Sequence, residues 1–191
     1  MSGFTAVGFF LVSVLFSLLI FSLWIRISLR YLRISPLTPF GQLIHTVTDP
    51  LVKPVLLVSK QKYKAGQKYD WIAFATLVFI EIIKIICLSL LAFHAIMPIP
   101  FLLIYLLADL IIQPCNILFF AILIRVIMSY VNPHWQHPIS DYLRVLTEPL
   151  LILGRRIIPD ISGFDFSPII IMIILKVITL FISASLPWKI L

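Results

Sequence analysis

Four ionisable residues interrupt long apolar stretches of the sequence, and they are the residues best placed for chemistry inside a membrane. They are Glu81, Lys84, Asp109 and Lys176. Placing an ionisable group in such a stretch costs free energy. It therefore indicates either an ion pair that fixes helix register or an ion or proton path. The four formal charges cancel. We expect Glu81 to pair with Lys176 or with Lys84, and Asp109 with the remaining lysine; both roles stay open.

A second set of polar residues occurs twice in the chain. An offset of 99 positions aligns Arg26 with Arg125 and the turn 48–51 with the turn 147–150, and an offset of 95 aligns 70–71 with 165–166. Each arginine is expected to hold the acid of its turn by a charge-assisted hydrogen bond. Snorkelling of both arginines to lipid headgroups is the alternative. The repeated motif consists of Arg26, Thr48, Asp49, Pro50, Arg125, Thr147, Glu148 and Pro149.

Apolar helices must position these residues, because the composition is that of a membrane protein. Of the 191 residues, 61% are hydrophobic and 12% charged, and the mean hydropathy is +1.11. A soluble domain has about 25% charged residues, so a soluble enzyme and a disordered chain are excluded. A spanning helix needs about 20 apolar residues. We therefore expect spans over about 4–32, 71–96, 101–131 and 166–187.

The basic residues give the orientation of these spans. Most of the net charge of +7 lies in the segments 33–70 and 131–165 and at the adjoining helix ends. The positive-inside rule places both segments in the cytoplasm and both termini outside. The expected location is the inner (plasma) membrane. The basic residues expected to face anionic lipid are Lys60, Lys62, Lys64, Lys68, Arg155 and Arg156. A topology signal explains the same charges equally well.

The repeated motif predicts an all-α membrane protein of two parallel repeats, 1–98 and 99–191. Each repeat is expected to contain a span, a cytoplasmic segment and a second span. Helical spacing of apolar residues over 40–47 and 139–146 predicts amphipathic helices at the membrane interface. A proline after the acid is expected to break or redirect each helix. A shallow re-entrant turn is the alternative to an interfacial helix.

The second repeat carries a recognisable pattern. It comprises Arg125, Asn132-Pro133, Leu146-Thr147-Glu148-Pro149, Arg155-Arg156, Pro159 and Phe164-Asp165-Phe166-Ser167-Pro168. In this pattern the chain resembles the YggT family, also called YlmG-like, and the first repeat is a divergent copy. The resemblance implies a small integral membrane protein. Bacterial members are associated with osmotic or envelope stress or with cell-division gene clusters, and plastid members with cytochrome b6f assembly or nucleoid organisation. The resemblance implies no agreed chemical activity.

Motifs for catalysis or cofactor binding are absent from the sequence. It has no metalloprotease, serine hydrolase, Walker A or dinucleotide fingerprint. The pair His134 and His137 is weak as a metal or haem site because no third ligand is near. We therefore expect no cofactor, no metal and no enzyme activity.

The predicted role is organising or assembling membrane components in envelope or osmotic homeostasis, and a small ion transporter or channel component is the alternative. Expected partners are anionic lipids and other membrane proteins but not nucleic acid, and a homo-oligomer stays open.

Overall fold

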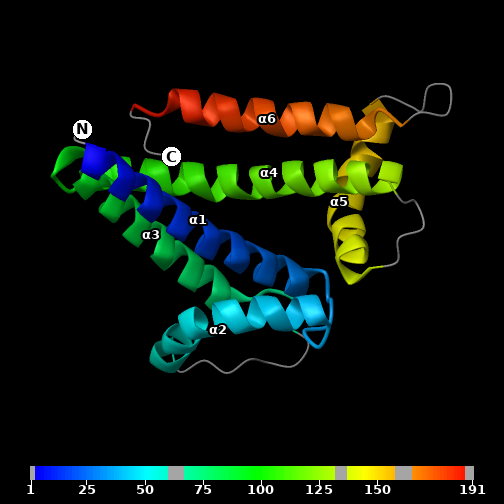
Figure 1. Cartoon of the computed structure of the whole chain (residues 1–191), viewed down its shortest axis with the longest axis horizontal. Helices are drawn as coiled ribbons and strands as arrows, with labels where there is room; N and C mark the ends of the chain where they lie inside the picture. The colour runs from blue at the N-terminus through cyan, green and yellow to red at the C-terminus, as the bar shows by residue number, and fades with distance from the viewer. Residues whose placement is uncertain (1–2, 60–66, 132–136, 158–164, 188–191) are drawn as a thin grey trace. The chain divides into compact units, whose positions relative to one another are not determined.

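The computed structural model describes residues 3–59, 67–131, 137–157 and 165–187, which form six α-helices and no strand. In chain order these are α1 (Gly3–Tyr31), α2 (Pro39–Ser59), α3 (Trp71–Phe93), α4 (Ile99–Val131), α5 (Pro138–Ile157) and α6 (Ser167–Ser185) (Figure 1). The basic residues Lys60, Lys62 and Lys64, and the pattern residues 132–136 and 158–164, lie outside the described ranges.

Four of these helices are long and apolar enough to cross a membrane. They are α1, α3, α4 and α6, with 29, 23, 33 and 19 residues. A helix rises about 1.5 Å per residue, so each is close to or longer than the roughly 30 Å of a bilayer core. The four predicted spans are therefore confirmed as helices, with ends that differ from the expected ones by at most three residues.

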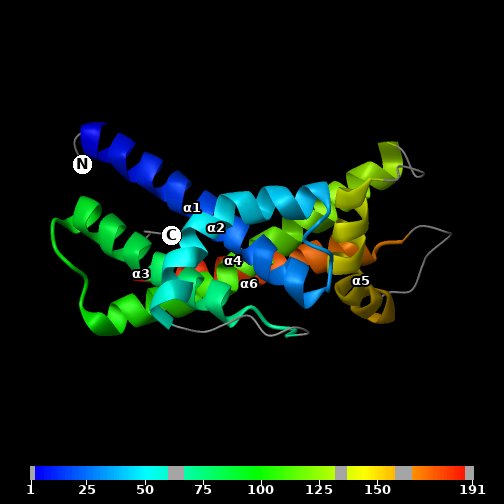
Figure 2. The same cartoon turned by 90° about the horizontal axis from the view of Figure 1, so that it is seen from below.

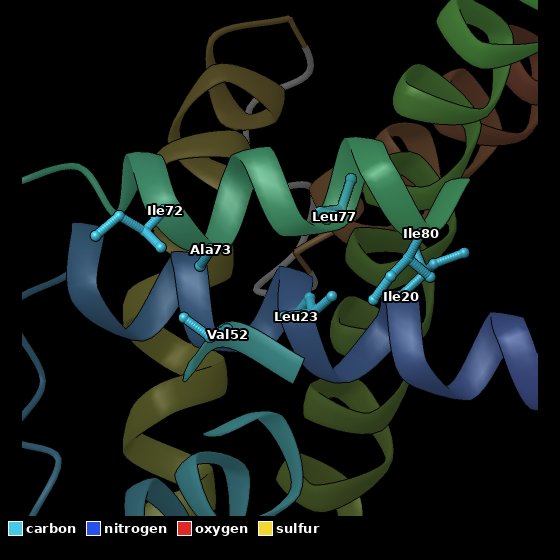
Figure 3. Packing of buried hydrophobic residues seen from close by; sticks show 7 residues of the cluster. All are labelled: Ile20, Leu23, Val52, Ile72, Ala73, Leu77 and Ile80. Carbon is cyan, nitrogen blue, oxygen red and sulfur yellow. The ribbon is translucent and has the colours of Figure 1, made fainter. Parts of the chain in front are cut away.

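The chain forms two compact units, which we describe separately. The first comprises residues 1–110 and 186–191, and its helices α1, α2 and α3 pack against one another. Figure 3 shows Ile20 and Leu23 of α1 against Leu77 and Ile80 of α3, with Val52 of α2 completing the cluster. Ala73, Leu77 and Ile80 of α3 recur at helical spacing, and this spacing sets the face that α3 buries.

The ends of α3 show why the chain reverses after it. Asp70 caps the N-terminus, because its carboxylate accepts a hydrogen bond of 3.0 Å from the Ala73 amide. His94 ends the helix in the left-handed conformation, with φ of 55°. Pro98 and Pro100 then favour a new helix start, since neither has an amide hydrogen. The reversal into α4 is visible in Figure 2.

The second unit comprises residues 111–185 and contains the rest of α4 with α5 and α6. Its core includes Ile122 of α4, Leu151 of α5, and Ile171 and Leu175 of α6. Gly154 of α5 lies directly on the start of α6. A Cβ at that position would be 2.8 Å from Ser167 Cβ, so the absence of a side chain allows this close packing.

Of the two effects expected of the prolines in the cytoplasmic helices, breaking or redirecting the helix, the break does not occur. Pro50 lies inside α2 and Pro149 inside α5, and both helices continue past them. Each proline removes one backbone hydrogen bond but leaves those on either side, so a helix supported by tertiary contacts can continue. Figure 1 shows α2 changing direction along its length, as expected for a helix that contains Pro50 and Pro54.

Candidate functional site

Arg26 near the C-terminal end of α1 holds α2 by its side chain. Its Nη1 donates to Thr48 Oγ1 over 2.8 Å and to Asp49 Oδ1 over 2.7 Å. Thr48 in turn donates to the Ile44 carbonyl within α2 over 2.7 Å. Arg26 and Thr48 are buried, with 5% and 0% of their surfaces exposed. The Arg26–Asp49 contact expected from the sequence is therefore present, and it docks α2 on the end of α1.

The second unit contains a cluster with the same arrangement. Arg125 of α4 donates to Thr147 Oγ1 over 2.8 Å and to Glu148 Oε2 over 2.7 Å. Thr147 donates to the Leu143 carbonyl over 2.7 Å, one turn earlier in α5. The Arg125–Glu148 contact is thus also present. In this unit the cluster docks α5 on α4, and its arginine side chain is more exposed than that of Arg26, 23% against 6%.

An acidic residue before the next span extends each cluster. In the first unit, Asp70 Oδ2 lies 3.6 Å from Arg26 Nε and 3.4 Å from Arg30 Nη1. In the second unit, Arg155 bridges Glu148 and Asp165, with distances of 3.2 Å and 2.9 Å. Each cluster therefore joins three consecutive helical elements of its unit.

Sequence reasoning did not assign these additional members a role in the clusters. It aligned Asp70 with Asp165 but saw no partner for either, and it placed Arg155 with the lipid-facing basic residues. The structure places Arg155 between two carboxylates, whereas Arg156 and Lys68 are exposed. The signal that could have identified the two acids is their shared position directly before a span in both copies.

These contacts shift the acid–base properties of the clusters. Burial raises the pKa of Asp49, but the hydrogen bond and charge of Arg26 outweigh it and hold the pKa below its ordinary value of 3.8. The hydrogen bond from Arg125 holds the pKa of Glu148 below 4.5. Burial and the Arg26 charge lower the pKa of His45, which lies 3.7 Å from Asp49. At neutral pH both acids are ionised and His45 is uncharged.

The intramembrane charges of the first unit form a separate cluster. Lys84 of α3 lies 3.5 Å from Glu81 Oε2 and donates to Asp109 Oδ2 of α4. All three are buried, with 0%, 3% and 1% of Glu81, Lys84 and Asp109 exposed. The pairing of Glu81 with Lys84, one of the expected alternatives, is thus formed. The same lysine also contacts Asp109, which is the pair expected under the other alternative, so one lysine serves both acids.

Lys176 lies in the second unit, on an exposed side of α6, and forms no ion pair with the described residues. Its expected pairing with Glu81, a residue of the first unit, stays a prediction. Within the described ranges, no group of three or more histidine, cysteine, aspartate or glutamate side chains is arranged as metal ligands. The geometry of the clusters is that of helix docking and charge pairing.

Comparison with known proteins identifies the family. Residues 101–186 match the family model described as CCB3/YggT. A Vibrio alginolyticus protein named "Uncharacterized protein in proC 3'region" is 33% identical over 166 residues, which are 86% of each chain. The chain belongs to the CCB3/YggT family.

Further relatives of this YggT-family chain include one that carries the family name. The Escherichia coli K12 protein named "Uncharacterized protein YggT" is 29% identical over 177 residues, 93% of this chain and 89% of the relative. A Pseudomonas aeruginosa protein named "Uncharacterized protein PA0392" is 35% identical over 71 residues, 37% of this chain. No solved structure matches this YggT-family chain. The family match falls on the part of the sequence where the resemblance is strongest.

Proposed function

We propose that this YggT-family chain is a non-enzymatic protein of the inner (plasma) membrane that organises membrane components or assists their assembly. The observation that carries the proposal is the docking of α2 and α5 on the spans by buried or half-buried arginine clusters. A docked helix has one face held by the protein, and its other face is available to lipids or to other proteins. The proposed setting is envelope or osmotic stress homeostasis.

The outer faces of the docked helices support this role. On α2, Leu57 and Val58 are 75% and 84% exposed, and on α5 Ile152 and Leu153 are 44% and 51% exposed. Basic side chains such as Lys53 and Arg156 accompany them. An apolar face with basic neighbours suits a helix lying at the surface of an anionic bilayer. We propose that both helices lie at the cytoplasmic interface and that the termini face outward.

The two clusters also support the proposed internal repeat. The same chemical contacts, arginine to threonine and acid, link a span to the following helix in each unit. An acid before the next span joins each cluster. Divergence of both units from one ancestral unit of three helices accounts for the shared contacts. Under this proposal the repeats are 1–98 and 99–191, parallel in the membrane.

A photoreactive residue tests the organising role. We would place it at Leu153 on the outer face of α5, and at Leu18 of α1, 62% exposed, as a lipid-facing control. After crosslinking in native membranes, the proposal expects the same membrane protein to be attached at Leu153 in osmotically stressed cells and not at Leu18. Lipid adducts alone at both positions would contradict it. Alkaline phosphatase fused at the C-terminus, active only outside the cytoplasm, tests the orientation.

An ion transporter or channel component is the second candidate, and the buried charges Glu81, Lys84 and Asp109 are the observation that favours it. Their mutual contacts weigh against it, because a conducting path needs hydrated charges rather than paired ones. Ion flux into proteoliposomes that contain the purified chain separates the two candidates. Flux that disappears in Glu81→Gln would establish transport, and equal osmotic survival of Glu81→Gln and wild type would count against it.

A further inference from the structure

The cluster of Glu81, Lys84 and Asp109 contains two carboxyl groups and a single amine. All three side chains are buried in the first unit. Lys84 contacts both acids, so each carboxyl group competes for the same positive charge. If all three groups were ionised, the cluster would have a net charge of −1 at a buried site within two candidate spans.

Within the described part of the first unit, the helices packed against the cluster supply no further positive charge. α1 packs against α3 and has no charged residue before Arg26. On α4, Tyr105 lies one turn before Asp109 and is fully buried, but a phenol carries no positive charge whether protonated or not. On α3, Cys87 lies one turn after Lys84, and a cysteine side chain likewise carries no positive charge. The excess negative charge therefore remains within the cluster itself.

The hydrogen bonds distinguish the two acids. Lys84 donates to Asp109 Oδ2, which makes this pair the charged one. Glu81 is 0% exposed, and neither of its carboxyl oxygens accepts a hydrogen bond. A buried carboxylate that accepts no hydrogen bond is far more costly than a neutral carboxylic acid at the same place.

We propose that this cluster is a proton-binding site, in which Glu81 carries a proton at neutral pH while Lys84 and Asp109 form an ion pair. The proton resolves the charge imbalance without a metal ion or a partner protein. It leaves the site only when water or another cation reaches Glu81, so proton occupancy is linked to the packing of α3 against the first part of α4. The site is separate from the arginine clusters and does not depend on the organising role.

Infrared spectroscopy of the full chain in lipid nanodiscs tests the proposal. A protonated carboxyl group gives a carbonyl band distinct from that of a carboxylate. The background is favourable, because Glu81 and Asp109 are the only acids of the eight in the chain that lie within the candidate spans. The expected signal at pH 7 is one protonated carboxyl group per wild-type chain and none in Glu81→Gln. Labelling glutamate with ¹³C should shift the band.

Three outcomes would overturn the proposal. The first is no protonated carboxyl band in the wild type. The second is a band that ¹³C-glutamate leaves unmoved, because the proton would then be on Asp109. The third is a band that appears only after Na⁺ and K⁺ are replaced by a bulky organic cation, because a metal ion would then occupy the site.

A second variant provides a separate readout in case Glu81→Gln fails to fold. Lys84→Met removes the amine and should raise the signal to two protonated carboxyl groups per chain, a twofold increase over wild type. Thermal unfolding of Glu81→Gln at pH 7 should match wild type, because glutamine resembles the protonated acid. A clear loss of stability in Glu81→Gln would instead show that Glu81 is ionised and would contradict the proposal.

Discussion

Replacing Arg26 by glutamine tests whether the buried arginine cluster supports the fold. The change removes hydrogen bonds to Thr48 and Asp49 and a contact with Asp70. The side chains of Arg26 and Asp70 are 6% and 2% exposed, so a buried charge loses a partner. Breaking a buried pair costs about 3–5 kcal/mol. Arg30 remains 3.4 Å from Asp70, so we expect the lower end of that range, about 3 kcal/mol.

The counterpart in the second unit should respond less. The side chains of Arg125 and Glu148 are 23% and 33% exposed, so solvent screens their interaction. A pair of this kind contributes roughly 0.2–1 kcal/mol. For a chain of this size, each 1 kcal/mol changes the melting temperature by about 2–4 °C. We therefore expect Arg26→Gln to lower it by about 6–12 °C, and Arg125→Gln by at most about 4 °C.

The assay is thermal unfolding of the purified chain in a mild detergent, followed by size-exclusion chromatography with tryptophan fluorescence. Lys53→Gln is the matched control, because its ammonium lies 3.7 Å from the same Asp49 carboxylate but is 72% exposed. This control should change the stability by less than about 0.5 kcal/mol. Equal losses in Arg26→Gln and Lys53→Gln, or a larger loss in Arg125→Gln, would refute the reasoning from burial.

Three further predictions follow from the helix ends and the close contacts. Asp70→Ala should lose more stability than Asp70→Asn, because asparagine keeps the cap of α3, worth about 1 kcal/mol, and alanine does not; equal losses in thermal unfolding would contradict the capping role. Acid should weaken the docking of α5, because the lowered pKa of Glu148 contributes stability above its ordinary value of 4.5 that is lost as the pH falls through the folded-state pKa. Glu148→Gln should flatten the decline in melting temperature between pH 6 and about pH 3, and an unchanged slope would rule the contribution out. Gly154→Leu should destabilise the contact of α5 with α6 by about 1–3 kcal/mol, measured by the same unfolding assay. The control Gly8→Ala, where a Cβ meets no atom within 4 Å, should leave the protein as stable as wild type or slightly more so.

The spans could be predicted from the sequence because they depend on a local property, the length of an apolar stretch. The contacts of Arg26 and Arg125 could be predicted for a different reason, since the repeated spacing showed each arginine together with its acid. In both cases the information lies in the order of residues along the chain. Neither prediction required knowledge of how one helix is rotated against another.

The contacts that could not be predicted depend on that rotation. Lys84 contacts Glu81 because the two are one turn apart in α3, but its simultaneous contact with Asp109 requires α3 and the first part of α4 to turn these faces toward each other. Hydropathy records that a span is apolar but not which side of it faces its neighbour. The continuation of α2 through Pro50 is similar, because tertiary packing outweighs the local cost of proline.

The geometry of the arginine clusters limits which residue can occupy their centre. Arg26 directs Nη1 to Thr48 and Asp49 and Nε toward Asp70, whereas Arg125 uses both terminal nitrogens. A lysine ammonium carries all its donors on one nitrogen, so it cannot reproduce contacts that two separate nitrogens of a planar guanidinium make. In a related sequence, lysine at either position would therefore indicate a protein whose adjoining helix is released from its span.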